Sequence, residues 1–202
     1  MRHNKMLRKS KKLLLILISV LTLAFGCGDS LTEDELVAQV KPFKAHLSEY
    51  TSAPDPKNIS LTEAPYIVGK VIPIRRGEYE IHWMGARAGF PRGSYTELGK
   101  PEDAIDEFYS ELPTELRART PEEVKTVIWL EWTRNVVGRY TSGAEAHQFK
   151  CTLSVIDRTR NAMIGQKTFY GANPPEKTSN VTFGTLPLDE ILQYVTSLPR
   201  RP

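Results

Sequence analysis

The chain has 202 residues, with 27 lysines and arginines against 24 aspartates and glutamates, and a formal net charge of +3. Six of the basic residues and none of the acidic ones fall within residues 1–27, so residues 28–202 hold 21 basic and 24 acidic residues and are about three units negative. This distribution excludes a nucleic-acid partner recognised through a basic domain surface, and the length predicts a single domain.

The N-terminus has the three-part layout of a secretory signal. A cationic segment is followed by the apolar run Leu13–Ala24 and then by small residues. The apolar residues end at Gly28, short of the roughly 20 that a membrane helix needs. Positive charge before the run holds that end in the cytoplasm, so the rest of the chain is exported whether the signal is cleaved or kept as a single-helix anchor.

The segment Leu23-Ala24-Phe25-Gly26-Cys27 resembles the lipobox of bacterial lipoproteins. This resemblance implies cleavage between Gly26 and Cys27 and a diacylglyceryl group on the Cys27 thiol. Ala24 stands where the family usually has leucine, and Ala24 with Gly26 also suits ordinary signal peptidase. The resemblance therefore predicts a lipoprotein anchored on the extracytoplasmic side of a membrane, either facing the periplasm or in the outer membrane.

The residues after the signal predict a short helix and then a linker. Thr32 and Glu35 have the spacing of a capping box, and Pro42 limits or kinks the helix that they start. We expect residues 27–50 to hold the lipid site and this helix. Residues 51–63 are polar and contain prolines, which predicts a linker before a domain spanning residues 64–199.

The first half of that domain predicts two strands and a helix. Tyr66–Ile74 is rich in β-branched residues, and Pro73 indicates an edge strand or the end of a strand. A turn then leads to a second strand over Tyr79–Met84. Pro101–Leu112 has a proline and two acids in its first turn and an apolar stripe at helical spacing, so it predicts a helix.

The second half predicts a sheet core and a final helix. Val124–Trp132 is a continuous apolar run, typical of a central strand buried on both faces, and Val136–Tyr140 continues or re-pairs it. Phe149–Ile156 and Ala162–Tyr170 read as a hairpin. An apolar stripe predicts a C-terminal helix starting near Pro187. The fold class is therefore α+β, with a two-layer, mainly antiparallel sheet of about five strands packed by two amphipathic helices.

Segments in the second half are similar to uncharacterised bacterial lipoproteins, a resemblance that implies no activity. They are Leu112–Ala118, Pro121–Val124, Val137–Tyr140 and the hairpin that begins with Val155, Ile156 and Asp157.

The sequence offers little support for catalysis. Its four histidines are scattered, no metal motif or nucleophile elbow is present, and neither a metal nor a cofactor is predicted. Cys151 with His147 is the sharpest enzymatic hypothesis. The two residues lie four positions apart on a strand, which separates them by about 13 Å at ~3.3 Å per residue. At that distance the two side chains cannot share a proton. We expect Cys151 to be a buried, inert thiol.

A binding surface is the leading functional prediction. Aromatic and basic side chains alternate in one glycine-rich segment, and stacking combined with charge is a common recognition chemistry. These residues are Trp83, Arg87, Phe90, Arg92 and Tyr95. The loop from Gly171 to Gly184 is the second candidate. The expected function is a non-enzymatic envelope module that binds an envelope protein or an anionic envelope component. An envelope enzyme that depends on Cys151 or on an unrecognised site, and a structural spacer, remain the alternatives.

Overall fold

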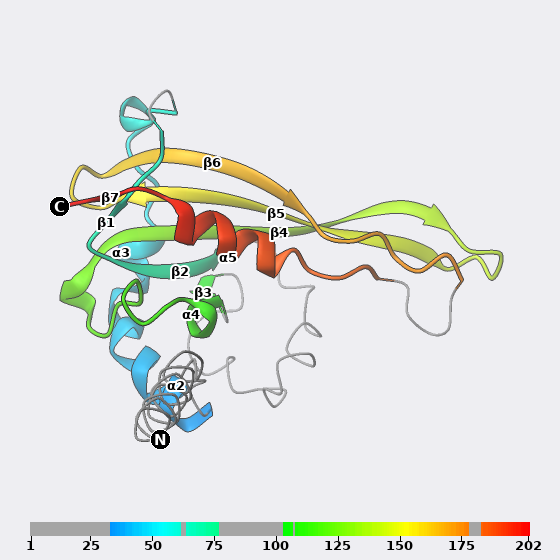
Figure 1. The fold of residues 1–202 in the computed structure, drawn as a ribbon, viewed down its shortest axis with the longest axis horizontal. Helices are drawn as coiled ribbons and strands as arrows, with labels where there is room; N and C mark the ends of the chain where they lie inside the picture. Colours follow the sequence, from blue (N-terminus) through cyan, green and yellow to red (C-terminus); the bar gives the residue numbers. More distant parts are fainter. Residues whose placement is uncertain (1–32, 62–63, 77–102, 107, 178–182) are drawn as a thin grey trace, which may run out of the picture. The chain divides into compact units, whose positions relative to one another are not determined.

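The computed structural model of the protein describes residues 33–61, 64–76, 103–106, 108–177 and 183–202 (Figure 1). Its main sheet has the strand order β3-β2-β4-β5-β6. The strands are β2 (Lys70–Arg76), β3 (Asp103–Ile105), β4 (Val124–Arg139), β5 (Glu145–Asp157) and β6 (Ala162–Tyr170). Only β2 and β4 pair in parallel, while the other neighbours are antiparallel. The predicted α+β class with a mainly antiparallel sheet is confirmed.

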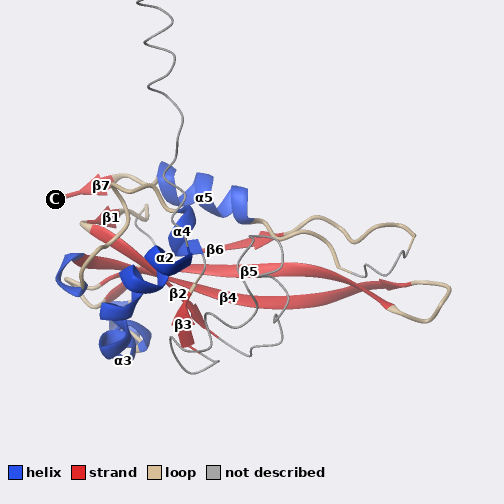
Figure 2. Ribbon diagram, turned by 90° about the horizontal axis from the view of Figure 1, so that it is seen from below, coloured by secondary structure: helices blue, strands red, loops and turns tan. Residues whose placement is uncertain are grey.

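β4 is the central strand because its apolar run can be buried on both faces. Successive side chains of a strand point to opposite faces, and Ile128 and Leu130 join a core cluster with Ile191 of helix α5 (Leu188–Ser197). Between them, Trp129 donates its indole N–H to the Tyr50 carbonyl on the other face at 2.7 Å. Figure 2 shows α5 and α3 on opposite sides of the sheet. Because helical residues lie on both faces, the predicted two-layer packing is not confirmed.

The N-terminal helical segment changes type where proline requires it. Helix α2 (Glu33–Val40) is followed by the 3₁₀ helix η1 (Lys41–His46), which has Pro42 in its first turn, and then by α3 (Leu47–Thr51). Proline cannot donate the amide hydrogen bond that would continue α2, so the chain turns there. The sequence predicted this interruption correctly.

The segment expected to be a linker contacts the sheet over its described residues. It contains the 3₁₀ helix η2 (Pro56–Asn58), and Ile59 then forms an isolated parallel bridge with Met163 of β6. The Ser60 amide donates to the Met163 carbonyl at 3.0 Å. These bonds tie residues 58–60 to the outer edge of β6.

Pro73 lies inside β2, where a proline normally costs a ladder hydrogen bond. Its carbonyl accepts the amide of Asp106 at 3.1 Å, so its nitrogen faces the β3 side of the strand. β3 has already ended there, at Ile105 opposite Ile74. The missing N–H therefore leaves no partner of the ladder unsatisfied, which explains how a strand within the sheet accommodates the proline.

The helix predicted over Pro101–Leu112 is wrong for most of its described residues. Asp103–Ile105 forms β3, and helix α4 is confined to Phe108–Glu111. Ile105 is buried and paired with Ile74, and the Asp106 carboxylate accepts the Phe108 amide at 2.9 Å to start α4. Pairing with β2 thus outweighs the helical spacing of the apolar residues in this segment.

The second half of the chain follows the prediction closely. The β5–β6 hairpin and α5 form where expected, and the second part of β4 continues the strand with a bulge between Val136 and Gly138. β4 and β5 continue past the ends of β2 and β6, because Arg76 pairs with Glu131 and Tyr170 with Lys150. The structure adds a two-stranded parallel pair that the sequence did not predict, β1 (Ile67–Val68) with β7 (Arg200–Arg201).

Candidate functional site

A surface hollow of about 320 Å³ lies where the N-terminal helices meet the start of β4 and the β5–β6 turn. Its lining comes from three separate parts of the chain: η1 with α3, the 3₁₀ helix η4 (Pro121–Glu123) with the start of β4, and the turn after β5. The charged or titratable members are His46, Glu49, Glu122, Lys125 and Arg158, and we call this site the Arg158 hollow.

The turn that carries Arg158 is held by the buried carboxylate of Asp157. Its Oδ1 accepts the amide and the hydroxyl of Thr159, at 2.9 and 2.6 Å, and its Oδ2 accepts the Tyr66 hydroxyl at 3.0 Å. The Arg158 amide donates to the Lys125 carbonyl at 2.9 Å. These bonds fix the direction in which the Arg158 side chain leaves the turn.

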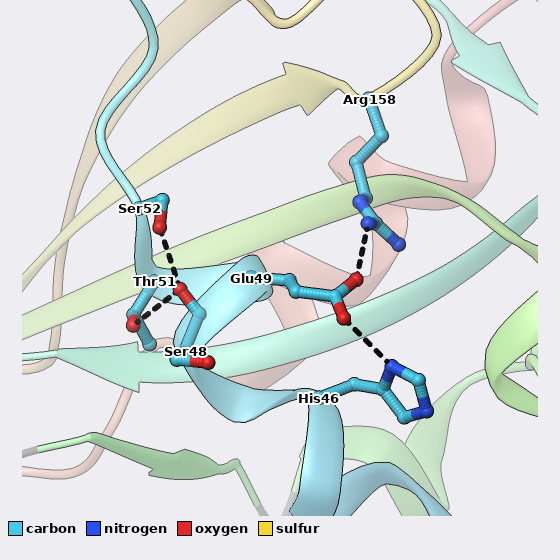
Figure 3. A network of polar contacts seen from close by, with 6 residues as sticks. All are labelled: His46, Ser48, Glu49, Thr51, Ser52 and Arg158. Atoms are coloured by element: carbon cyan, nitrogen blue, oxygen red, sulfur yellow. Dashed lines mark hydrogen bonds and ion pairs between the residues drawn. The ribbon is translucent and has the colours of Figure 1, made fainter.

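Arg158 and His46 hold the Glu49 carboxylate from both sides (Figure 3). His46 Nδ1 lies 2.9 Å from Oε1, and Arg158 Nη2 lies 2.9 Å from Oε2. The hydrogen bond with His46 is the main reason that the pKa of Glu49 falls below its ordinary value, with Arg158 adding to the effect. Glu49 is therefore ionised at neutral pH, and both of its oxygens are occupied.

Tyr50 forms an apolar support beneath the arginine. The Arg158 guanidinium carbon lies 4.8 Å from the centre of the Tyr50 ring, within range of a cation–π interaction. Burial raises the pKa of Tyr50 to about 12, so its hydroxyl stays neutral. That hydroxyl is buried and has no hydrogen-bond partner within the described ranges. Tyr50 thus helps to orient Arg158 through the packing of its ring.

The remaining charged groups face the hollow with fewer contacts. The pKa of Glu122 is lowered first by a hydrogen bond from the Thr120 side chain and also by the charge of His46. In the part of the chain that the structure describes, the Lys125 ammonium has no hydrogen bond or ion pair, and Arg158 donates a side-chain hydrogen bond to Glu49. The hollow therefore presents more free donors than free acceptors.

Among the described residues that line the hollow, Thr159 supplies the one hydroxyl and no thiol is present. The Thr159 hydroxyl already donates to Asp157, and the sulfur of Cys151 lies elsewhere, in the core cluster with Trp132 and Leu153. Cys151 is fully buried, and burial raises the pKa of its thiol far above the usual range. His147 stacks on Phe183 with ring centres 5.0 Å apart, outside that cluster.

Most of the residues singled out by the sequence lie outside the described residues. Gly26 and Cys27 fall outside the described residues, as do the members of the predicted binding surface, Trp83, Arg87, Phe90, Arg92 and Tyr95. The second candidate loop is described at both ends, where Gln148 Nε2 donates to the Gly171 carbonyl at 2.9 Å and to Asn173 Oδ1 at 3.1 Å. This end of the loop is therefore tied to β5.

The sequence contains no motif that would reveal the Arg158 hollow. Glu49 and Arg158 are 109 positions apart and belong to elements that meet only in the folded unit. The one local signal is the spacing of His46 and Glu49, which puts the two side chains on neighbouring turns. Such spacing is common on exposed helices and does not by itself indicate a site.

Three further findings complete the description. Within the described ranges, no three histidine, cysteine, aspartate or glutamate side chains converge in a way that would bind a metal ion. Among the same residues, no helix has the length and apolar character needed to cross a membrane. Comparisons with protein-family models, curated proteins and solved structures gave no match to this chain.

Proposed function

We propose that the chain is an exported lipoprotein, acylated at Cys27, whose α+β unit serves as a non-catalytic binding module on the extracytoplasmic side of a membrane. The observation that carries this proposal is the N-terminal order of a cationic segment, a short apolar run and the lipobox-like residues before Cys27. Each buried methylene of an acyl chain contributes about 0.8 kcal/mol, so two or more chains anchor the module stably.

The chemistry of the described residues supports a binding role. Cys151, the sharpest candidate nucleophile, is buried among apolar side chains and has a raised pKa. A thiol reacts as the thiolate, which such surroundings disfavour. Several charged side chains line the Arg158 hollow, where His46 and Arg158 both contact Glu49.

The proposed partner is an envelope protein or an anionic envelope component. The segment with Trp83, Arg87, Phe90, Arg92 and Tyr95 is the proposed contact surface, because its residue types combine aromatic stacking with positive charge. The loop from Gly171 to Gly184 is the second proposed surface. Substituting Trp83 and Arg92 by alanine together is expected to abolish partner capture without changing the thermal stability of the unit.

The anchor is tested by the intact mass of the protein extracted from membranes, beside Cys27→Ala and the matched control Cys151→Ala. We expect a chain that begins at Cys27 and carries acyl groups in the wild type and in Cys151→Ala, and loss of that species in Cys27→Ala. An unmodified chain beginning at Cys27 would overturn the lipid anchor and leave a soluble exported protein. An intact leader would overturn cleavage and establish a helix-anchored protein.

A further inference from the structure

We propose that the Arg158 hollow binds the oxyanion group, a carboxylate or a phosphate, of a small ligand. This inference rests on the binding role proposed above and is independent of the lipid anchor. It also needs none of the residues outside the described ranges, because His46, Glu49, Glu122, Lys125 and Arg158 all belong to them.

The Arg158 hollow has a surplus of hydrogen-bond donors. An arginine guanidinium has five N–H groups and a lysine ammonium has three, while neither accepts a hydrogen bond. Arg158 uses Nη2 to bond to Glu49, which engages one of its two Nη2 hydrogens. Lys125 adds its ammonium from β4, without a hydrogen bond or ion pair in the described structure. A ligand that accepts hydrogen bonds satisfies these groups.

The two acids of the hollow do not satisfy all of these donors. Both oxygens of Glu49 are engaged, one with His46 and one with Arg158, each at 2.9 Å. Glu122 is stabilised as an anion by Thr120 and by the charge of His46. The two acids balance the charges of Lys125 and Arg158, so these four groups together carry no net negative charge that would repel an anion.

Contacts within the protein position Arg158 before any ligand arrives. Glu49 holds one edge of the guanidinium, the Tyr50 ring packs against its face at 4.8 Å, and the turn beneath it is fixed by Asp157. A positioned guanidinium loses little conformational freedom on binding, and its planar fork matches the oxygens of carboxylates and phosphates. Arg158 is therefore the primary contact and Lys125 the second.

The hollow contains both cationic donors and the Glu122 carboxylate, so substitutions of the two kinds should shift oxyanion affinity in opposite directions. Removing a donor weakens binding of an oxyanion, whereas removing the Glu122 charge strengthens it. Charge-assisted hydrogen bonds are strong enough that losing one weakens binding about tenfold or more. We expect Arg158→Gln and Lys125→Gln each to lower affinity by about that factor, and Glu122→Gln to raise affinity several-fold.

The test is calorimetric titration of the full processed chain in detergent with inorganic phosphate, and separately with succinate. Saturable binding of either probe that responds to the substitutions as expected supports the proposal, and the probe that binds identifies the oxyanion. Arg139→Gln is the matched control, because Arg139 pairs with Glu145 on the distal part of β4, away from the hollow. Its affinity should equal that of the wild type.

Lys125→Gln keeps the test decisive if Arg158→Gln disturbs folding, since the Lys125 side chain makes no polar contact in the described structure. Absence of saturable binding for both probes would overturn the proposal, as would binding unchanged in Lys125→Gln. Intact mass reads the lipid anchor independently on the same sample. Failure of the hollow and failure of the anchor are therefore distinguishable.

Discussion

Two glycines mark a place where the chain passes against its own backbone, and replacing either one tests the structure strongly. A Cβ atom built on Gly171 would lie 1.8 Å from the carbonyl oxygen of Thr185, and one built on Gly184 would lie 1.8 Å from that of Ala172. Side-chain carbons essentially never approach closer than 3.0 Å. Each alanine would therefore force the two backbone segments apart by more than about 1 Å.

The expected cost has two parts. Overpacking in a tight site typically costs 1–3 kcal/mol, and here the obstacle is backbone, which cannot rotate away. Separation also strains two hydrogen bonds, from the Gly171 amide to Phe149 at 2.8 Å and from the Gly184 amide to His147 at 2.9 Å. Each such bond contributes about 1 kcal/mol net. We expect Gly171→Ala and Gly184→Ala each to lower the free energy of unfolding by about 3 kcal/mol.

The assay is urea-induced unfolding with two control variants. Gly138→Ala should be nearly neutral, because its Cβ would meet only the Ala146 side chain at 4.0 Å. Gly143→Ala should cost about 1–2 kcal/mol from backbone strain alone, since its φ is +86° and no atom lies within 4 Å. If Gly171→Ala and Gly184→Ala lose no more stability than Gly138→Ala, the close backbone crossing is refuted.

Three further predictions concern titratable groups. Cys151 should resist a thiol reagent in the native protein and react after denaturation, and rapid labelling of the native protein would contradict its burial. Cys151→Ser should lower the free energy of unfolding by about 1–3 kcal/mol, because a hydroxyl finds no partner in the core. The pKa of Glu49 is lowered from 4.5, so its contribution to stability is present above that value and lost as pH falls through the folded-state pKa. The free energy of unfolding in urea should therefore fall less steeply at acidic pH for Glu49→Gln than for the wild type. Equal pH dependence of the two proteins would contradict the contacts with His46 and Arg158. Tyr50 and Tyr109 have pKa values raised to about 12 from 10.0, so the stability they contribute is present below pH 10.0 and lost as pH rises toward about 12. Tyrosinate absorbance should show that both residues ionise above pH 10.0. Ionisation of both at the ordinary pKa would refute their burial.

Much of the second half of the fold could be predicted from the sequence because its signals are local. The apolar run of β4, the alternation and turn residues of the β5–β6 hairpin and the stripe of α5 each lie within a short window. A continuous apolar run buries both faces of a strand wherever that strand sits in a sheet. Such patterns do not depend on the identity of distant neighbours.

Residues 103–111 show where this reasoning fails. Helical spacing of apolar residues predicted one helix there, but the choice between strand and helix depended on whether an open edge of β2 lay nearby. Pairing of Ile105 with Ile74 is a tertiary event, since the two residues are far apart in the sequence. Local periodicity carries no information about it.

The sequence by itself determined the α+β class, the central strand, the hairpin and the final helix, and it supports the predicted export signal. The tertiary structure decided which residues share the Arg158 hollow, because Glu49 and Arg158 meet across 109 positions only when α3 packs beside the β5–β6 turn. It also decided that Cys151 lies in the core. Charge and burial depend on neighbours in space, and those neighbours are set by packing rather than by adjacency along the chain.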